Sequence, residues 1–301
     1  MRIAIVGTGG VGGYLGAKLW KAGNDVIFTA RGDHLATMQH NGLTLVSPEG
    51  NITVQSTFTD TLTNQSSVDL AIIAVKSFDT LSACRLIGPV IKDDTMVLSI
   101  QNGIENEGIL AQEIGSHHNI IGGVAYIFST ITKPGIVRHQ GIAKFKFGEL
   151  NGETSNRCHI LEEVFKQAEI DANAVNDIQR LLWEKWIFIC GVGGMTAYAR
   201  KPIGEILANV KLNDMLSKVV GEAAGIGRAK KIVQSDDLEE KDMAYYRRLP
   251  YDSTSSMYYD VIHGKRVEVE ALNGAAVRFG KELNIPTPAN EKIFKKLQPL
   301  I

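Results

Sequence analysis

The feature that most constrains the fold is a glycine-rich turn that separates an apolar run from a helical segment at the start of the sequence. Arg2–Val6 is a short β-branched run that ends in glycines. Apolar residues of Val11–Ala22 have helical spacing, and Gly23-Asn24 ends this segment as Gly or Asn does at helix C-termini. Asp25–Thr29 is a second apolar run of strand length. A strand, a helix and a strand in close succession predict the βαβ unit of a parallel sheet.

The turn reads Gly7-Thr8-Gly9-Gly10-Val11-Gly12 and fits the pattern G-x-G-x-x-G. In this pattern the first glycine forms the tight turn, the second lets the backbone approach a pyrophosphate, and the third lets helix and strand pack closely. The helix N-terminus then faces the phosphate charge. Because the motif follows a predicted strand and opens a predicted helix, it predicts a dinucleotide site that includes Gly7, Gly9, Gly10 and Gly12. The alternative is a glycine-rich turn that binds no ligand.

Arg31 follows the second predicted strand, at the position where NAD enzymes usually carry Asp or Glu for the ribose 2′-hydroxyl. The planar guanidinium of arginine is suited to a 2′-phosphate. We therefore predict NADP(H) rather than NAD as the cofactor. Asp33, two residues later, keeps NAD open, and a solvated surface arginine is the simpler alternative.

Three later apolar runs, Val68–Val75, Thr95–Ile100 and Asn119–Val124, have strand length, and the first is apolar on both faces, as a central parallel strand must be. The stretch Gly135–Gly148 alternates and contains a glycine turn, so we expect it to form an antiparallel hairpin that completes the sheet. Residues 1–175 are therefore predicted to form an α/β domain with a Rossmann doubly wound sheet.

Two polar residues follow predicted strands at the edge where such sheets bind ligands. Lys76 comes directly after Val68–Val75, and a lysine there could contact the cofactor or an anionic substrate. Asn102 lies in Gln101-Asn102-Gly103, and its amide could bond the nicotinamide or a catalytic group. A plain surface lysine and an ordinary Asn-Gly turn remain open as alternatives.

Beyond residue 176 the periodicity changes from strand to helix. Helical spacing is found in Ile178–Ala199, Leu212–Ala229, Asp236–Arg247, Lys265–Leu283 and Asn290–Leu297. Residues 176–301 are therefore predicted to form an all-helical domain.

Composition narrows the class of protein further. The formal net charge is −1, which gives no overall attraction to nucleic acid or to an anionic membrane. Cys84, Cys158 and Cys190 are far apart and odd in number, so neither a disulfide framework nor a metal site is expected. The apolar start is too short for a signal-peptide core, and the longest apolar stretch is too short to span a bilayer. We expect a cytoplasmic protein.

The chain resembles the ketopantoate reductase (2-dehydropantoate 2-reductase) family along nearly its whole length. The matching features are Gly7–Gly12, Arg31, Val75-Lys76, Gln101-Asn102-Gly103, Leu182-Trp183-Glu184-Lys185-Trp186, and the stretch from Ser255 through Glu268 to Asn273-Gly274. The last stretch reads SSMYYDVIHGKRVEVEALNG and is the most specific, because it is close to the family's SSM-x-x-D … E-x-x-x-x-N-G pattern.

The resemblance implies an N-terminal Rossmann domain, a helical C-terminal domain and an active site in the cleft between them. It implies NADPH-dependent reduction of a 2-oxo acid to a 2-hydroxy acid, ketopantoate to pantoate in pantothenate biosynthesis. Carried over by residue, Lys185 would be the general acid, Glu268 and Ser256 would hold substrate, and Asn102 and Lys76 would line the cofactor side. A lysine ammonium suits this reaction because hydride delivery to a ketone leaves negative charge on oxygen. Glu268 could also orient the lysine.

The chain departs from the family at several amide positions. Four and eight residues after the lysine the family carries asparagines, and these positions are Ile189 and Gly193 here. Two further family asparagines correspond to Ser253 and Ile203. These departures put the substrate in doubt more than the reaction class.

Three other functions remain open from the sequence: a paralogue that reduces a different 2-oxo acid, an opine-type dehydrogenase that reduces an imine, and a non-catalytic NADP-binding sensor. Lys185, Ser256 and Glu268 favour a 2-oxo acid reductase over the opine-type enzyme, and Lys185 and Glu268 argue against the sensor. A homodimer is compatible with the helical domain.

Overall fold

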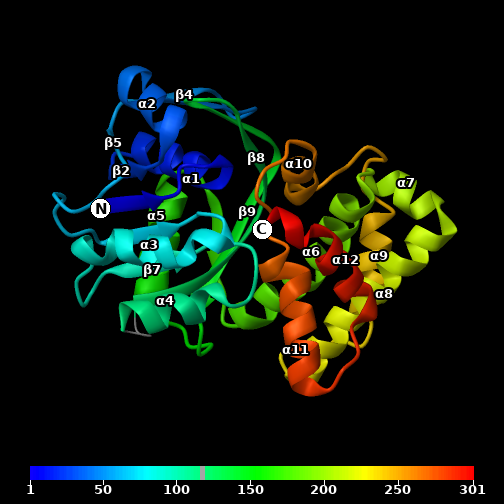
Figure 1. Ribbon diagram of the computed structural model, residues 1–301. Helices are drawn as coiled ribbons and strands as arrows, with labels where there is room; N and C mark the ends of the chain where they lie inside the picture. The colour runs from blue at the N-terminus through cyan, green and yellow to red at the C-terminus, as the bar shows by residue number, and fades with distance from the viewer. Residues whose placement is uncertain (116–118) are drawn as a thin grey trace. The chain divides into compact units, whose positions relative to one another are not determined.

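The computed structural model of the 301-residue chain describes residues 1–115 and 119–301. Contacts between residues divide the chain into two compact units. The first consists of Met1–Gln101 and Glu105–Ile178, and the second consists of Asn102–Ile104 and Gln179–Ile301. Figure 1 follows the chain from the strands of the first unit to the helices of the second.

The first unit is built on a mixed, mostly parallel sheet with ten strands among the described residues. The strand order is β4-β3-β9-β8-β7-β6-β1-β2-β5, and β10 pairs with β9. β1 lies between β2 and β6, with both pairings parallel, and β6 pairs in parallel with β7. The strands are β1 (Arg2–Val6), β2 (Asp25–Thr29), β3 (Leu43–Val46), β4 (Ile52–Val54), β5 (Thr57–Thr59), β6 (Leu70–Ile73), β7 (Met96–Ser99), β8 (Ile120–Lys133), β9 (Ile136–Glu149) and β10 (Asp171–Ala174).

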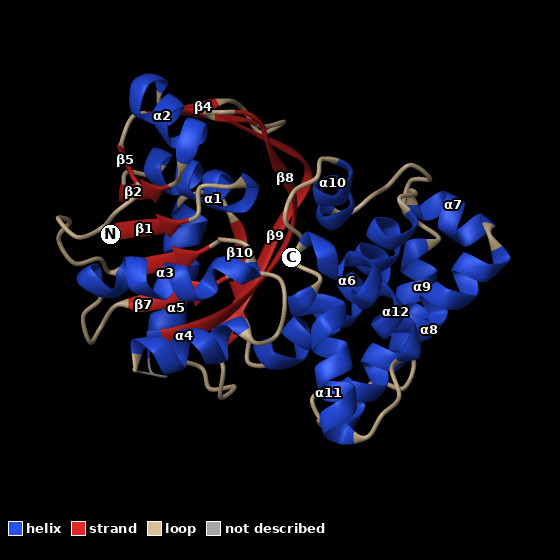
Figure 2. Cartoon of the chain, in the orientation of Figure 1, coloured by secondary structure: helices blue, strands red, loops and turns tan. Residues whose placement is uncertain are grey.

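Helices pack against both faces of this sheet (Figure 2). Ile3 and Ile5 of β1 belong to a core that they share with α1, α2 and α5, whereas Ala4 and Val6 belong to a core that they share with α3 and α4. The predicted doubly wound α/β fold is confirmed, and the double coverage explains why the central strands are apolar on both sides. The helices are α1 (Gly10–Lys21), α2 (Gly32–Asn41), α3 (Thr80–Ile87), α4 (Asn106–Ile114) and α5 (Asn156–Gln167), with the short turns η1 (Ser77–Asp79) and η2 (Gly88–Val90).

The hairpin predicted within Gly135–Gly148 is wrong in its placement. This stretch is almost entirely one strand, β9, which pairs antiparallel with β8, and the connecting turn contains Gly135. Gly141, the glycine inside this stretch, lies where the register shifts within β9, with φ of +71°. Glycine with positive φ occurs both in bulges and in hairpin turns, so the sequence pattern does not show which of the two a glycine forms.

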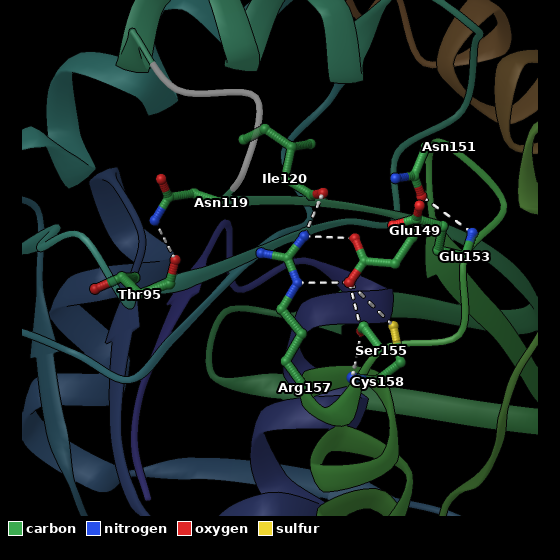
Figure 3. Close-up of polar contacts among 9 residues, drawn as sticks. All are labelled: Thr95, Asn119, Ile120, Glu149, Asn151, Glu153, Ser155, Arg157 and Cys158. Carbon is green, nitrogen blue, oxygen red and sulfur yellow. Dashed lines mark hydrogen bonds and ion pairs between the residues drawn. The ribbon is translucent and has the colours of Figure 1, made fainter.

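A partly buried ion pair joins the end of β9 to the start of α5 (Figure 3). Arg157 donates from Nε to Glu149 Oε1 at 2.6 Å and from Nη2 to Oε2 at 2.5 Å, and Ser155 Oγ donates to Oε1 at 2.5 Å. Arg157 Nη2 also donates to the carbonyl of Ile120, at the start of β8, at 3.4 Å. Burial opposes ionisation of Glu149, but the hydrogen bonds from Arg157 and Ser155 outweigh it, so the pKa of this carboxyl lies below its usual value. Through these bonds Arg157 joins the end of β9, the start of β8 and the start of α5.

The second unit is helical, as predicted. The buried side chains of its helices form one hydrophobic core, which includes Trp186 and Cys190 of α6 and Tyr246 of α9. The elements are α6 (Ile178–Ala199), α7 (Ile203–Ala208), α8 (Val210–Ala229), α9 (Leu238–Tyr246), α10 (Ser256–Ile262), the π-helical turn η4 (Glu270–Gly274), α11 (Ala275–Leu283), α12 (Pro288–Leu297) and the turn η5 (Gln298–Leu300). No helix among the described residues is long and apolar enough to cross a membrane.

The helix predicted over Lys265–Leu283 is shorter than expected. Residues 265–268 are not helical, and the segment becomes helical only at η4, which continues into α11. In η4 the amide of Gly274 donates to the carbonyl of Val269 at 2.8 Å, which is the i to i+5 bond of a π turn. Glu268 therefore precedes the helix instead of lying within it.

Candidate functional site

The glycine-rich loop is tied by hydrogen bonds to the end of β2. The amide of Gly7 donates to Thr29 Oγ1 at 3.1 Å, and Thr29 Oγ1 donates to the carbonyl of Ile5 at 3.1 Å. The amide and the hydroxyl of Thr8 both donate to the carbonyl of Thr29 at 2.9 Å. Gly7 has φ of +97°, a conformation that other residues rarely adopt. The loop is therefore held firmly against the carboxyl ends of β1 and β2.

The four glycines of the motif fall into two groups. A Cβ atom added to Gly7, Gly10 or Gly12 would lie 2.7 Å or less from a neighbouring atom, so packing alone requires these glycines. A Cβ atom added to Gly9 would meet no heavy atom within 4 Å among the described residues. Open space at the second glycine is what the close approach of a pyrophosphate needs. The loop therefore fits a dinucleotide.

The N-terminus of α1 adds to this fit. Gly9 is the N-cap of the helix, and its first turn contains no acidic residue, while Lys18 and Lys21 lie in its last turn. The first amides of a helix have no partner within the helix and carry partial positive charge. An anionic group placed at Gly9 would find favourable charge and hydrogen-bond donors there.

Arg31 is the N-cap of α2, and its side chain is 74% exposed. Its Nη2 lies 2.5 Å from Asp79 Oδ2, in η1. Asp33 lies in the first turn of α2. The guanidinium is thus at the end of β2, where the 2′ substituent of an adenosine ribose is expected, and Asp79 neutralises part of its charge.

The predicted residues of the first unit follow neighbouring strands. The motif begins directly after β1, Arg31 lies two residues after β2, and Lys76 lies three residues after β6. Because these strands are parallel neighbours in the sheet, their carboxyl ends share one edge. Asn102 follows β7, the next parallel strand, and belongs by its contacts to the second unit.

Gln101, next to Asn102, has a structural role. Its Nε2 donates to the carbonyl of Val75 at 3.1 Å and to Thr80 Oγ1 at 2.9 Å, so it joins the segments that follow β6 and β7. Gly103 has φ of +107° and forms the turn that follows. The positive φ of Gly103 is compatible with the ordinary Asn-Gly turn that the sequence left open as the alternative.

Lys185 lies in the first half of α6 and is half-buried. The preceding residue, Glu184, accepts a hydrogen bond from Arg180 Nη1 at 2.7 Å. The uninterrupted helix from Ile178 to Ala199 places Lys185, Ile189 and Gly193 on one face, as their spacing of four predicts.

Ser256 and Glu268 lie in segments that are anchored to the same helix. Ser256 is exposed and begins α10, whose N-cap residue Ser255 lies 2.8 Å from Thr196 Oγ1 of α6 through its own Oγ. Glu268 is 5% exposed and precedes η4, in which Asn273 Nδ2 donates to the carbonyl of Cys190 at 3.2 Å. The structure thus attaches both segments to α6, which carries Lys185.

The three glycines of α6 differ in what surrounds them. A Cβ atom on Gly191 would lie 2.4 Å from Tyr246 Oη, and one on Gly194 would lie 2.6 Å from Asn273 Oδ1. A Cβ atom on Gly193 would meet only Cγ2 of Ile189, at 3.0 Å, among the described residues. Gly191 and Gly194 therefore serve packing against other elements, while a Cβ on Gly193 would be close only to Ile189 of its own helix, on the face that Lys185 shares.

Two polar residues with unusual surroundings were missed by the sequence reasoning. His34 contacts the glycine-rich loop through the carbonyl of Thr8 at 2.8 Å, and Asp242 of α9 is a carboxyl that is only 8% exposed. Neither residue belongs to a sequence motif. For Asp242, the one available signal is its position in a segment with helical spacing, and His34 has no such signal.

Comparison with known proteins assigns the family. The family described as ketopantoate reductase PanE/ApbA matches residues 3–152, and its C-terminal domain family matches residues 177–300. The 2-dehydropantoate 2-reductase of Archaeoglobus fulgidus is 31% identical over 293 residues, which cover 97% of this chain and 95% of that protein.

Solved structures agree with this assignment. The 2-dehydropantoate 2-reductase of Geobacter metallireducens superimposes with a TM-score of 0.92 at 28% identity, with 100% of both chains covered. A structure of D-mandelate dehydrogenase with NADH and anilino(oxo)acetate gives a TM-score of 0.90 at 22% identity over 100% of this chain and 99% of the other, and shares the fold. With both of its domains matched, this chain belongs to the ketopantoate reductase family of oxidoreductases.

Proposed function

We propose that this protein uses NADPH to reduce the carbonyl of a 2-oxo acid to a hydroxyl group, as a 2-dehydropantoate 2-reductase does. The observation that carries the proposal is the family match over both domains, together with a glycine-rich loop whose second glycine alone faces open space. The reaction consumes one proton and converts NADPH to NADP⁺.

In this proposal the cofactor is held by the first unit and by Asn102, which belongs to the second unit. The amides at the start of α1 bind the pyrophosphate, Arg31 binds the 2′-phosphate, and Lys76 and Asn102 contact the nicotinamide half. The bound cofactor supplies the hydride that the carbonyl carbon accepts. Asp79 opposes the preference for NADPH because its carboxylate pairs with Arg31 and would lie near the phosphate.

The second unit supplies the proton and holds the substrate. Lys185 donates a proton to the carbonyl oxygen as negative charge develops there, and its ammonium stabilises that charge before the transfer. Glu268 accepts a hydrogen bond from a substrate hydroxyl and orients Lys185, and Ser256 binds the substrate.

The face of α6 favours a substrate with a less polar tail than ketopantoate. Ile189 offers hydrocarbon next to Lys185, and the space at Gly193 is bounded by that same side chain. A polar substrate group left without a partner there costs about 1–3 kcal/mol. We therefore propose a paralogue with shifted specificity as the second candidate, with pantoate formation as a lesser activity.

A panel of 2-oxo acids tests the reaction and the substrate together. NADPH oxidation is followed with ketopantoate, 2-oxoisovalerate and longer 2-oxo acids, for the wild type and for Ile189→Asn. We expect turnover with 2-oxo acids, a low kcat/KM for ketopantoate, and a relative gain for ketopantoate in the variant. A wild type that strongly prefers ketopantoate would contradict the expectation of a less polar substrate. Turnover only when an amine is added would indicate an opine-type enzyme, and binding without turnover would indicate a sensor.

Gly9, where an added Cβ would meet open space, and Gly10, where it would clash, give a matched test of the cofactor site. Gly9→Ala should leave the free energy of unfolding nearly unchanged, because its Cβ meets nothing within 4 Å, but should weaken NADPH binding. Gly10→Ala should destabilise the fold, because its Cβ would lie 2.1 Å from the carbonyl oxygen of Ser129. Urea unfolding and a fluorescence titration with NADPH measure both effects. Unchanged NADPH affinity in a folded Gly9→Ala variant would contradict the proposed site.

A further inference from the structure

His34 joins three segments of the first unit through its two ring nitrogens. It lies in the first turn of α2 and is half-buried. Its Nε2 is 2.8 Å from the carbonyl oxygen of Thr8, in the glycine-rich loop. The amide of Gly135, in the turn between β8 and β9, donates to its Nδ1 at 2.9 Å.

These two partners determine where the ring hydrogen lies. A backbone amide can only donate, so Nδ1 accepts with its lone pair, and a carbonyl can only accept, so Nε2 carries the hydrogen. The neutral ring with its hydrogen on Nε2 satisfies both bonds. Burial lowers the pKa of His34 below its usual value, and the hydrogen bond to Thr8 only partly offsets this effect, so the neutral form is favoured.

The bond to Thr8 sets the direction of the next amide. The carbonyl of Thr8 and the amide of Gly9 belong to one planar trans peptide, in which the C=O and N–H bonds point in opposite directions. With the carbonyl held by His34, the Gly9 amide is directed away from α2. Gly9 is also the position where a side chain would enter open space.

The β8–β9 hairpin contacts the loop at a second point. Ser129 Oγ of β8 donates to the carbonyl of Gly10 at 2.9 Å, and a Cβ atom on Gly10 would lie 2.1 Å from the Ser129 carbonyl. Thr8 and Gly10 are thus both held by groups outside the loop, and Gly9 lies between them. His34 supplies the first of these contacts and links it to the hairpin turn.

We propose that His34 is a positioning residue for the dinucleotide: it fixes the Thr8–Gly9 peptide so that the loop keeps the shape that receives the pyrophosphate. This rests on the proposed binding of a dinucleotide at the loop. Because the pyrophosphate is common to NADPH and NADH, loss of His34 should weaken both cofactors equally. This distinguishes its role from that of Arg31, which concerns NADPH alone.

Three substitutions separate the two bonds of His34. His34→Ala removes both. His34→Gln places an amide nitrogen near Nε2 and can still donate to Thr8, whereas His34→Asn places an oxygen near Nδ1 and can still accept from Gly135. His40→Ala is the control, because His40 is an exposed histidine in the last turn of the same helix. NADPH and NADH titrations give the dissociation constants, urea unfolding reports stability, and kcat is measured at saturating cofactor.

We expect His34→Ala to raise Kd about tenfold for both cofactors, the effect of one or two hydrogen bonds, with kcat unchanged. His34→Gln should return Kd to within about threefold of the wild type, whereas His34→Asn should remain as weak as His34→Ala. His34→Ala with wild-type Kd, or a Gln variant no better than the Asn variant, would overturn the proposal. Failure of the wild type to bind either cofactor would instead refute the proposed function of the loop.

Discussion

Asp242 should make the stability of this protein depend on pH in a way that one substitution removes. Its side chain on α9 is 8% exposed, and its Oδ2 has no hydrogen-bond partner among the described residues. Burial, and then the charges of Glu184 and Glu239, raise the pKa of Asp242 from 3.8 to about 7. Ionisation of Asp242 therefore adds a negative charge near Glu184 and Glu239, and its buried Oδ2 has no donor among the described residues to offset that charge.

The sign and size of the change in folding stability follow from the pKa of Asp242 in the unfolded chain and in the folded protein. An unfolded chain releases this proton near pH 3.8, but the folded protein keeps it up to about pH 7, so folding stability falls as the pH rises between these values. Each tenfold change in an acid constant is worth about 1.36 kcal/mol, so ionised Asp242 costs about 4 kcal/mol above pH 7. Below pH 3.8 the cost is absent, because both states hold the proton.

Asp242→Asn keeps the shape of the neutral acid and cannot ionise. Urea unfolding of both proteins should show the variant more stable by about 4 kcal/mol at pH 8 and by under about 2 kcal/mol at pH 5. Glu240→Gln, at an exposed position of the same helix, is the control and should change stability little at either pH. A stability difference for Asp242→Asn that is the same at pH 5 and pH 8 would refute the reasoning.

Other contacts give predictions of their own. Arg31→Ala should weaken NADPH by about 1.5–3 kcal/mol and leave NADH nearly unchanged in fluorescence titrations, and equal losses would remove Arg31 from the 2′-phosphate site. Asp79→Asn should tighten NADPH relative to NADH, because it removes the carboxylate that pairs with Arg31; unchanged selectivity would exclude Asp79 from cofactor choice. Arg157→Ala should lower the free energy of unfolding by about 1.5–3 kcal/mol in urea, because Glu149 stays buried and loses its charged hydrogen bonds, whereas a loss under about 0.5 kcal/mol would mean that water replaces the guanidinium.

The parts of the fold that local patterns determine could be predicted from the sequence. Arg2–Val6 and Asp25–Thr29 are strands at the expected bounds, and Ile178–Ala199 is a helix at the expected bounds. Each of these elements is indicated by the spacing of its own apolar residues and by the glycines or polar residues that flank it, which are local features of the sequence. The family resemblance adds the chemistry of Lys185, which periodicity alone cannot supply.

What could not be predicted depends on contacts between distant segments. The length of β9 is set by pairing with β8, and the glycine pattern of Gly135–Gly148 fits a hairpin equally well. The π turn that places Glu268 before the helix is accompanied by a bond from Asn273 to α6. His34 and Thr8 are 26 positions apart, so no local pattern reports their contact.

The central claim, acid catalysis by Lys185 in an NADPH-dependent reductase, is tested most directly by one variant and two measurements. For Lys185→Ala, kcat is measured with the best 2-oxo acid of the panel, and the Kd of NADPH is measured by fluorescence titration. We predict that kcat falls about 10²–10⁴-fold, the usual contribution of a general acid. The Kd should stay close to the wild-type value, because Lys185 belongs to the second unit and the glycine-rich loop to the first. A kcat near that of the wild type would contradict the account.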